Sequence, residues 1–258
     1  MEYFALSNVG KKRENNEDFH FTDDENNLFI VADGMGGHKA GEVASKTAID
    51  NFILHFEKKF KKNNFILLGS SKISDKKKKD IESNISQAML DSASYANERI
   101  YKLGIANDNL SGMGTTLTGV FIFNLNAFVV HVGDSRLYVF RENGLELKTE
   151  DHTFVFELYK KGAISYEDTF SHPQRNYLTG VLGESELTAL DCFKFNLQEK
   201  DIILICTDGL NSMIKDRSIE DIFKKMHDKS SETIARKLIE QANKNGGMDN
   251  ITVIIIKI

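Results

Sequence analysis

Short apolar runs rich in Val, Ile and Phe recur along the chain, and each is bounded by Gly, Asp, Asn or Ser. Runs of this length with such borders are typical of buried β-strands. We therefore predict strands at residues 28–32, 117–123, 127–132, 137–140, 202–206 and 251–256. The second and third runs are joined through Asn124, Leu125 and Asn126, which predicts a β-hairpin.

A helical period replaces this pattern in three stretches. Residues 43–52 place apolar side chains on one face, residues 81–100 keep the i, i+3, i+4, i+7 spacing over several turns, and residues 231–242 are amphipathic. Between the first two, residues 58–79 carry the lysine clusters KKFKK and KKKK. We expect a basic, solvated surface insertion there; a docking site for an acidic partner is the alternative.

Composition is that of an ordinary soluble protein, with 41% apolar and 28% charged residues among 258. We expect one domain spanning residues 1–258, because large β-sandwiches reach this size. A net charge of −5 argues against nucleic acid as the main partner. The sequence lacks a signal peptide and a bilayer-spanning run, so we expect no membrane association and a cytoplasmic location. Cys206 lies in the run IILIC and is expected to be a buried small hydrophobe.

Aspartates stand at the ends of four predicted strands. Asp33 follows LFIVA, Asp134 follows FVVHVG, Asp208 follows IILICT, and Asp249 precedes ITVIII. A single Asp there is usually a turn residue. Four carboxylates brought together would require a cation between them, and oxygen-only ligands select Mg²⁺ or Mn²⁺. Two such ions suit phosphoester hydrolysis, since they make hydroxide from water and clamp the phosphoryl oxygens.

The N-terminal segment RENNED adds a cation and more acids. Arg13 could bind a phosphate, because its planar guanidinium donates two parallel hydrogen bonds. Taken alone, the segment is an ordinary charged loop, and we would expect it to be solvated.

These motifs together resemble the metal-dependent type 2C serine/threonine protein phosphatases in their compact bacterial form, almost from end to end. In the family's order they are RENNED (residues 13–18), VADGMGGH (31–38), GTT (114–116), VGDSR (132–136), DHT (151–153), HPQRN (172–176), TDGL (207–210) and DNIT (249–252). The resemblance implies an α+β fold, a four-layer α-β-β-α sandwich of two antiparallel sheets flanked by helices.

The resemblance also implies roles for individual residues. Asp33 would bridge two metal ions, Gly34 would offer its carbonyl to the second ion, and Asp208 and Asp249 would complete the ligands of the first ion. Glu17 and Asp18 would hold metal-bound waters, Arg13 would receive the phosphate, and Asp134 with Asp208 would bind a third ion. Residues 163–183 correspond to a mobile flap beside the site. Arg13, Asp33 and Asp208 are the expected catalytic residues.

The general acid stays open. Many animal relatives place a histidine directly after the Asp-Gly pair, whereas this chain has Met35 there and its nearest histidine is His38. Either His38 or a metal-bound water could protonate the leaving group. Asp134 has an alternative too, because Arg136 could pair with it as a plain ion pair.

The expected function is hydrolysis of phosphoserine and phosphothreonine on proteins by a monomer, reversing a bacterial Ser/Thr kinase. One alternative is a catalytically inactive binding module, although the expected metal carboxylates and the arginine are present. Another is a sporulation-type phosphatase acting on anti-sigma-factor antagonists. A nucleotide site at DGMGGHKAGE is excluded, since no Gly-Lys-Ser/Thr follows the glycines.

Overall fold

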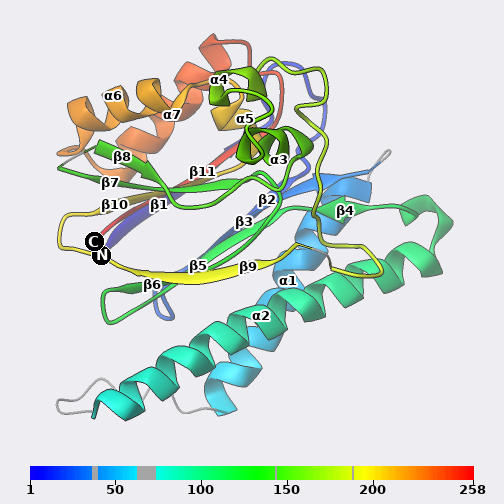
Figure 1. The fold of residues 1–258 in the computed structure, drawn as a ribbon, viewed down its shortest axis with the longest axis vertical. Helices are drawn as coiled ribbons and strands as arrows, with labels where there is room; N and C mark the ends of the chain where they lie inside the picture. Colours follow the sequence, from blue (N-terminus) through cyan, green and yellow to red (C-terminus); the bar gives the residue numbers. More distant parts are fainter. Residues whose placement is uncertain (37–39, 63–73, 143, 188) are drawn as a thin grey trace.

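Two antiparallel β-sheets lie face to face, and helices cover the outer face of each (Figure 1). The computed structural model describes residues 1–36, 40–62, 74–142, 144–187 and 189–258. The predicted four-layer α-β-β-α sandwich is confirmed.

The first sheet has five strands in the order β1-β11-β10-β7-β8, and the second has six, with β2-β3-β5-β6-β9 in order and β4 paired to β3. Their bounds are β1 (Glu2–Asn8), β2 (Asp18–Asp23), β3 (Leu28–Met35), β4 (Gly114–Thr115), β5 (Leu117–Phe123), β6 (Asn126–Val132), β7 (Arg136–Arg141), β8 (Gly144–Leu147), β9 (Asp191–Asn196), β10 (Ile202–Cys206) and β11 (Ile251–Lys257). All six predicted strands are present.

The predicted hairpin is β5–β6, in which Phe123 pairs with Asn126 across a two-residue turn. Asn124 and Leu125 have φ angles of 49° and 56°, which is the left-handed conformation at both turn positions. Two left-handed residues are what a type I′ turn requires, and its twist matches that of the strands.

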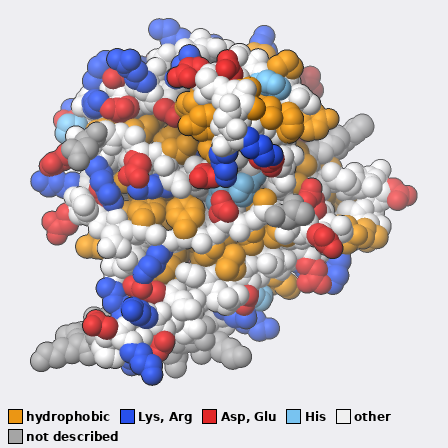
Figure 2. Space-filling view, in the orientation of Figure 1, with side chains coloured by type: hydrophobic (Ala, Val, Ile, Leu, Met, Phe, Trp, Pro, Cys, Tyr) orange, Lys and Arg blue, Asp and Glu red, His pale blue; other side chains and the backbone are white. Residues whose placement is uncertain are grey.

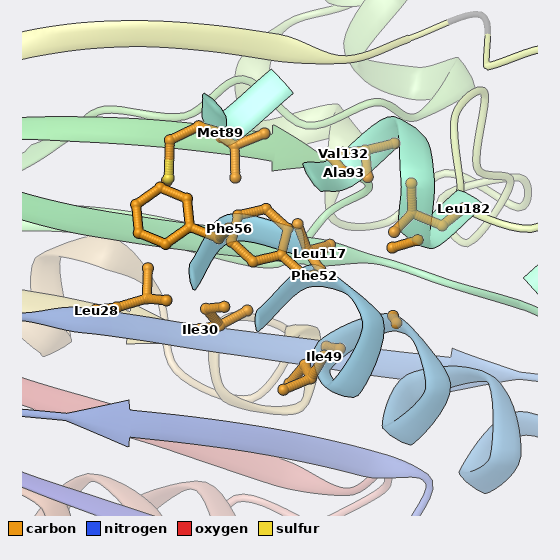
Figure 3. Close-up of a cluster of buried hydrophobic side chains, with 14 of the residues drawn as sticks. Leu28, Ile30, Ile49, Phe52, Phe56, Met89, Ala93, Leu117, Val132 and Leu182 are labelled. Atoms are coloured by element: carbon orange, nitrogen blue, oxygen red, sulfur yellow. The ribbon is translucent and has the colours of Figure 1, made fainter. Parts of the chain in front are cut away.

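The apolar runs are continuous because strands such as β3 are buried on both faces. Leu28, Ile30 and Ala32 face the helices, whereas Phe29 and Val31 face the other sheet. Figure 3 shows Leu28 and Ile30 against Phe52 and Phe56 of the overlying helix. A third apolar cluster fills the space between the first sheet and its own helices.

Helices α1 (Ala40–Lys62) and α2 (Asp75–Ala106) cover the second sheet, and α6 (Asp216–Met226) and α7 (Ser231–Lys244) cover the first (Figure 1). The shorter ones are η2 (Asp108–Leu110), α3 (Phe154–Lys160), α4 (Tyr166–Thr169) and α5 (Asp208–Asn211). All three predicted helices are confirmed. The expected loop at residues 58–79 is wrong at both ends, which continue α1 and begin α2; residues 63–73 lie outside the described residues.

Acidic and basic side chains are interspersed over the face in Figure 2. Cys206 is buried and free, as predicted. Within the described ranges, no helix is both long enough and apolar enough to cross a bilayer.

Candidate active site

The four aspartates at strand ends line one cleft. Asp33 lies near the end of β3, Asp134 between β6 and β7, Asp208 just after β10, and Asp249 just before β11. Arg13, Glu17, Gly34, Met35, Gly36, Thr116, Asn176, Leu178 and Asn250 complete the lining. The structure therefore brings together nearly all the residues that the sequence singled out, from both sheets.

Asp18 is the exception, because it lies behind the cleft. It pairs with Asp33 across β2 and β3. Its Oδ2 accepts hydrogen bonds from the hydroxyls of Thr207 and Thr252, at 2.8 and 2.7 Å, so it joins the second sheet to the first. Its Oδ1 is buried and has no hydrogen-bond partner among the described residues.

The cleft concentrates negative charge on four half-buried aspartates. Burial raises the pKa of Asp33 well above its usual range, and the charges of Asp18 and Asp208 raise it further. Burial and the charge of Asp208 act the same way on the pKa of Asp134. Burial and the charge of Asp249 raise the pKa of Asp208 to about 6. Such a cluster favours either protons or bound cations.

Two glycines permit the close approach of backbone that the cleft needs. A Cβ on Gly34 would lie 2.0 Å from the carbonyl oxygen of Gly41 in α1, so only glycine fits there. Gly133, next to Asp134, has a φ of +106°, and a Cβ there would lie 2.5 Å from Thr116 Cγ2. Both positions require glycine for the conformation that presents their neighbouring aspartates.

Asn250 fixes the segment that carries Arg13 and Glu17. Its side-chain nitrogen donates to the carbonyls of Val9 and Asn15, and its oxygen accepts from the backbone amide of Glu17. The interpretation of RENNED as a freely solvated loop does not describe this segment. The sequence analysis placed Asn250 in a motif but gave it no role. The signal available in the sequence was an asparagine directly before an apolar strand.

Arg13 does not point freely into solvent, because its Nη2 donates to Asp249 Oδ2 at 2.7 Å. Their side chains are 51% and 31% exposed. This hydrogen bond raises the pKa of Arg13, against the opposing effect of burial. Arg13, the residue expected to bind phosphate, thus contacts Asp249, a residue expected to bind metal.

Arg136 does not form the plain ion pair with Asp134 that the sequence allowed. Its guanidinium makes a bidentate pair with Asp151, at 2.8 and 2.6 Å, and a longer contact with Asp216. The backbone next to Asp134 is fixed by a different contact, in which the Gly133 amide donates to His152 Nδ1 at 3.2 Å.

Residues 163–183 contribute Asn176 and Leu178 to the wall of the cleft. Their mobility stays a prediction. His38 lies outside the described residues, so its candidacy as general acid stays a prediction as well.

The donor set fits hard divalent cations, because the described lining of the cleft offers carboxylates and no thiolate. In the described part of the chain, no three His, Cys, Asp or Glu side chains form a preformed metal cage.

Comparison with known proteins agrees with this chemistry. The family model described as protein phosphatase 2C matches residues 9–242. A serine/threonine phosphatase, stp, of Listeria welshimeri is 36% identical, over 96% of this chain and 92% of that protein. The Mycobacterium tuberculosis serine/threonine phosphatase PstP/Ppp has a crystal structure with a TM-score of 0.82 and 31% identity, covering 98% of this chain and 97% of that one.

A structure of the catalytic domain of serine/threonine protein phosphatase PstP contains two manganese ions. It is 30% identical to this chain, with a TM-score of 0.78 over 98% of this chain and 96% of that one. The chain described here belongs to the protein phosphatase 2C family of metal-dependent serine/threonine protein phosphatases.

Proposed function

We propose that this protein hydrolyses phosphoserine and phosphothreonine on proteins, using Mg²⁺ or Mn²⁺ held by Asp33, Asp208, Asp249 and the Gly34 carbonyl. The observation that carries the proposal is the convergence of these oxygens, with Asp134 and Arg13, in one cleft between the two sheets. When bound, the ions would lower the pKa of water to supply the attacking hydroxide and would clamp the phosphoryl oxygens.

The chain's own residues then have distinct tasks. Arg13 would orient the substrate phosphate at the cleft mouth, where it already contacts Asp249. Glu17 lines the cleft, and Asp18 lies behind it with one oxygen free, so both could hold waters around the ions. Asp134 and Asp208 line the same cleft, and this pair would hold a third ion.

We further propose a cytoplasmic monomer that reverses the action of a Ser/Thr kinase. The relatives named above act as serine/threonine phosphatases, which supports a phosphorylated protein as substrate. An inactive binding module is disfavoured, because every proposed metal carboxylate and Arg13 lies in the cleft.

The decisive experiment is a phosphatase assay on phosphoserine, phosphothreonine and phosphotyrosine peptides with Mn²⁺, Mg²⁺ or a chelator. We expect metal-dependent release of phosphate from the first two peptides. Selective action on an anti-sigma-factor antagonist would instead favour the sporulation-type class. If no peptide is hydrolysed although calorimetry shows that the protein binds metal, the result would favour the binding module.

A further inference from the structure

The segment at residues 163–183, which forms one wall of the cleft, is attached to the body of the protein near both ends. Near its start, the Tyr166 hydroxyl donates a 2.9 Å hydrogen bond to Asp216 Oδ2. Asp216 is the first residue of α6, one of the helices that cover the first sheet. This contact joins positions fifty residues apart in the sequence.

Near its other end, the segment pairs with the loop before α3. Leu178 forms an isolated β-bridge with Thr153. The amide of Phe154 donates to the carbonyl of Tyr177 at 2.9 Å. Leu178 is itself a lining residue of the cleft, so this attachment lies directly at the candidate site.

Both attachments lead to one buried cation, Arg136. Its bidentate pair with Asp151 fixes the loop that continues to Thr153. Its Nη1 also contacts Asp216 Oδ1, which accepts a 2.9 Å hydrogen bond from the Tyr138 hydroxyl. Arg136 is only 3% exposed and stands two residues after Asp134. The wall segment and a candidate metal ligand thus share one support.

The polar attachments matter because the segment does not pack solidly on the body. A cavity lies beneath it, with Thr169, Phe170 and Arg175 on the segment's side and Asp134, Asp151 and Asp208 on the other. Where apolar packing is incomplete, the position of a segment depends more on hydrogen bonds to charged groups than it does in a well-packed segment.

Local hydrogen bonds connect the Tyr166 attachment to the cleft wall. The His172 amide donates to the Asp168 carbonyl at 3.0 Å, and the Arg175 amide donates to the His172 carbonyl at 3.1 Å. The Tyr177 amide then donates to the Gln174 carbonyl at 3.1 Å. A displacement at Tyr166 would therefore be passed along successive turns to Asn176 and Leu178.

We infer that Tyr166 and Asp216 are positioning residues that set the enzyme's preference for protein substrates. They hold Asn176, Leu178 and the intervening Tyr177, 67% exposed, where polypeptide flanking a phosphorylated residue would lie. A small aryl phosphate carries no flanking polypeptide for this wall to position. The inference rests on the proposed function.

The test compares Tyr166→Phe and Asp216→Asn with the unaltered protein on a phosphothreonine peptide and on p-nitrophenyl phosphate, with saturating Mn²⁺. Loss of a hydrogen bond to a carboxylate should raise KM for the peptide about fivefold to tenfold. We expect kcat to stay within about twofold, and KM for the aryl phosphate likewise. The double variant should show less than the product of the two single effects, because both remove the same contact.

The matched control is Tyr159→Phe, which removes a hydroxyl from the neighbouring ring, 5.5 Å from that of Tyr166, and should change neither KM. Amide hydrogen exchange at residues 163–177 gives a readout independent of turnover, and it should quicken in Tyr166→Phe and Asp216→Asn but not in Tyr159→Phe.

The outcomes separate the inference from the function it rests on. An inactive wild type would refute the proposed function and, with it, the specificity role. Amide hydrogen exchange would still show whether the Tyr166–Asp216 hydrogen bond holds the segment in place. An active wild type with unchanged peptide KM in both variants would overturn the inference. So would an equal loss of kcat on both substrates with a lowered Tm, since that is a purely structural effect.

Discussion

Arg13 donates a 2.7 Å hydrogen bond to Asp249, so one contact links the residue proposed to bind phosphate with a residue proposed to bind metal. Asp249 Oδ1 accepts from the amide of Asn250, which leaves little freedom for the carboxylate to turn. The guanidinium and an ion would therefore compete for the same oxygen atom. Changes at Arg13 should consequently affect metal binding and substrate binding in opposite directions.

Arg13→Ala should raise KM for a phosphothreonine peptide and tighten the binding of Mn²⁺. Arg13 is half exposed, so we expect about a tenfold change in KM, near 1.4 kcal/mol, below that of a buried pair. Arg13→Lys should restore KM only in part, because an ammonium cannot form the parallel pair. Steady-state kinetics and calorimetric titration with Mn²⁺ measure the two effects; unchanged values in both variants would contradict the role.

Asp33→Asn should abolish turnover while the fold persists, and Asp208→Asn should do the same. The charges of Asp18 and Asp208 raise the pKa of Asp33 beyond the effect of burial, so a neutral amide relieves repulsion. We expect the metal-free variant to be more stable than the metal-free wild type by about 1 kcal/mol. Denaturant unfolding in chelator checks this. Near-normal turnover at saturating metal would show that the site is misplaced.

Chelation should remove activity completely and re-addition of Mn²⁺ or Mg²⁺ should restore it, since every proposed ligand is oxygen. The melting temperature should rise on adding metal, because ions that bind only the folded state stabilise it. Full turnover after exhaustive chelation would exclude metal catalysis by this cleft.

The strands that the sequence predicted are the interior strands of the two sheets. Those it did not predict lie at the edges, apart from the two-residue β4, which pairs with β3. The order of strands places β1, β8, β2 and β9 at the four edges. An interior strand is covered on both faces and reads as a continuous apolar run, whereas an edge strand such as β9, DCFKFN, alternates with polar residues. Alternation over six residues is a weak signal, so these segments were missed.

The sequence placed the cleft's aspartates correctly because each stands at the end of an apolar strand. It could not show that Arg136 pairs with Asp151 and Asp216, because the three positions are far apart in the chain and each has nearer charges to choose from. The same limit hid the role of Asn250. Long-range polar pairing depends on the register of the sheets, which the periodicity of single segments does not specify.

His131 should make the protein less stable in acid. Burial lowers its pKa to about 3, and its ring lies between the Thr118 hydroxyl and the Glu150 carbonyl. The unfolded chain takes up a proton near pH 6.5 that the folded protein refuses, so stability is full above that pH and falls as pH drops toward 3. The slope from this residue is at most about 1.4 kcal/mol per pH unit.

His131→Gln tests this, because the amide can still donate to the Glu150 carbonyl but does not titrate. The variant should be less stable than wild type at pH 8 and should lose less stability between pH 7 and pH 4, as measured by urea unfolding in chelator. Parallel curves for the two proteins would show that His131 does not cause the acid sensitivity.

At Asp134, a metal-binding role and a structural role predict different effects of substitution. The plain ion pair with Arg136 would have explained this carboxylate without any ligand, but Arg136 is engaged by Asp151 at 2.6 and 2.8 Å. Burial and the charge of Asp208 raise the pKa of Asp134, so its ionised form needs another cation nearby. A third ion between Asp134 and Asp208 would meet that need.

Asp134→Ala should therefore lower kcat at least about tenfold, leave the two-metal centre occupied, and leave the metal-free Tm unchanged or raised. Asp151→Ala is the contrasting variant, because it leaves the buried Arg136 guanidinium without its bidentate partner and should lower Tm strongly. Calorimetric titration with Mn²⁺ should show one weak binding step fewer in Asp134→Ala than in wild type. If Asp134→Ala instead lowered Tm and kept kcat per folded molecule, the carboxylate would be structural and the third ion would have no site here.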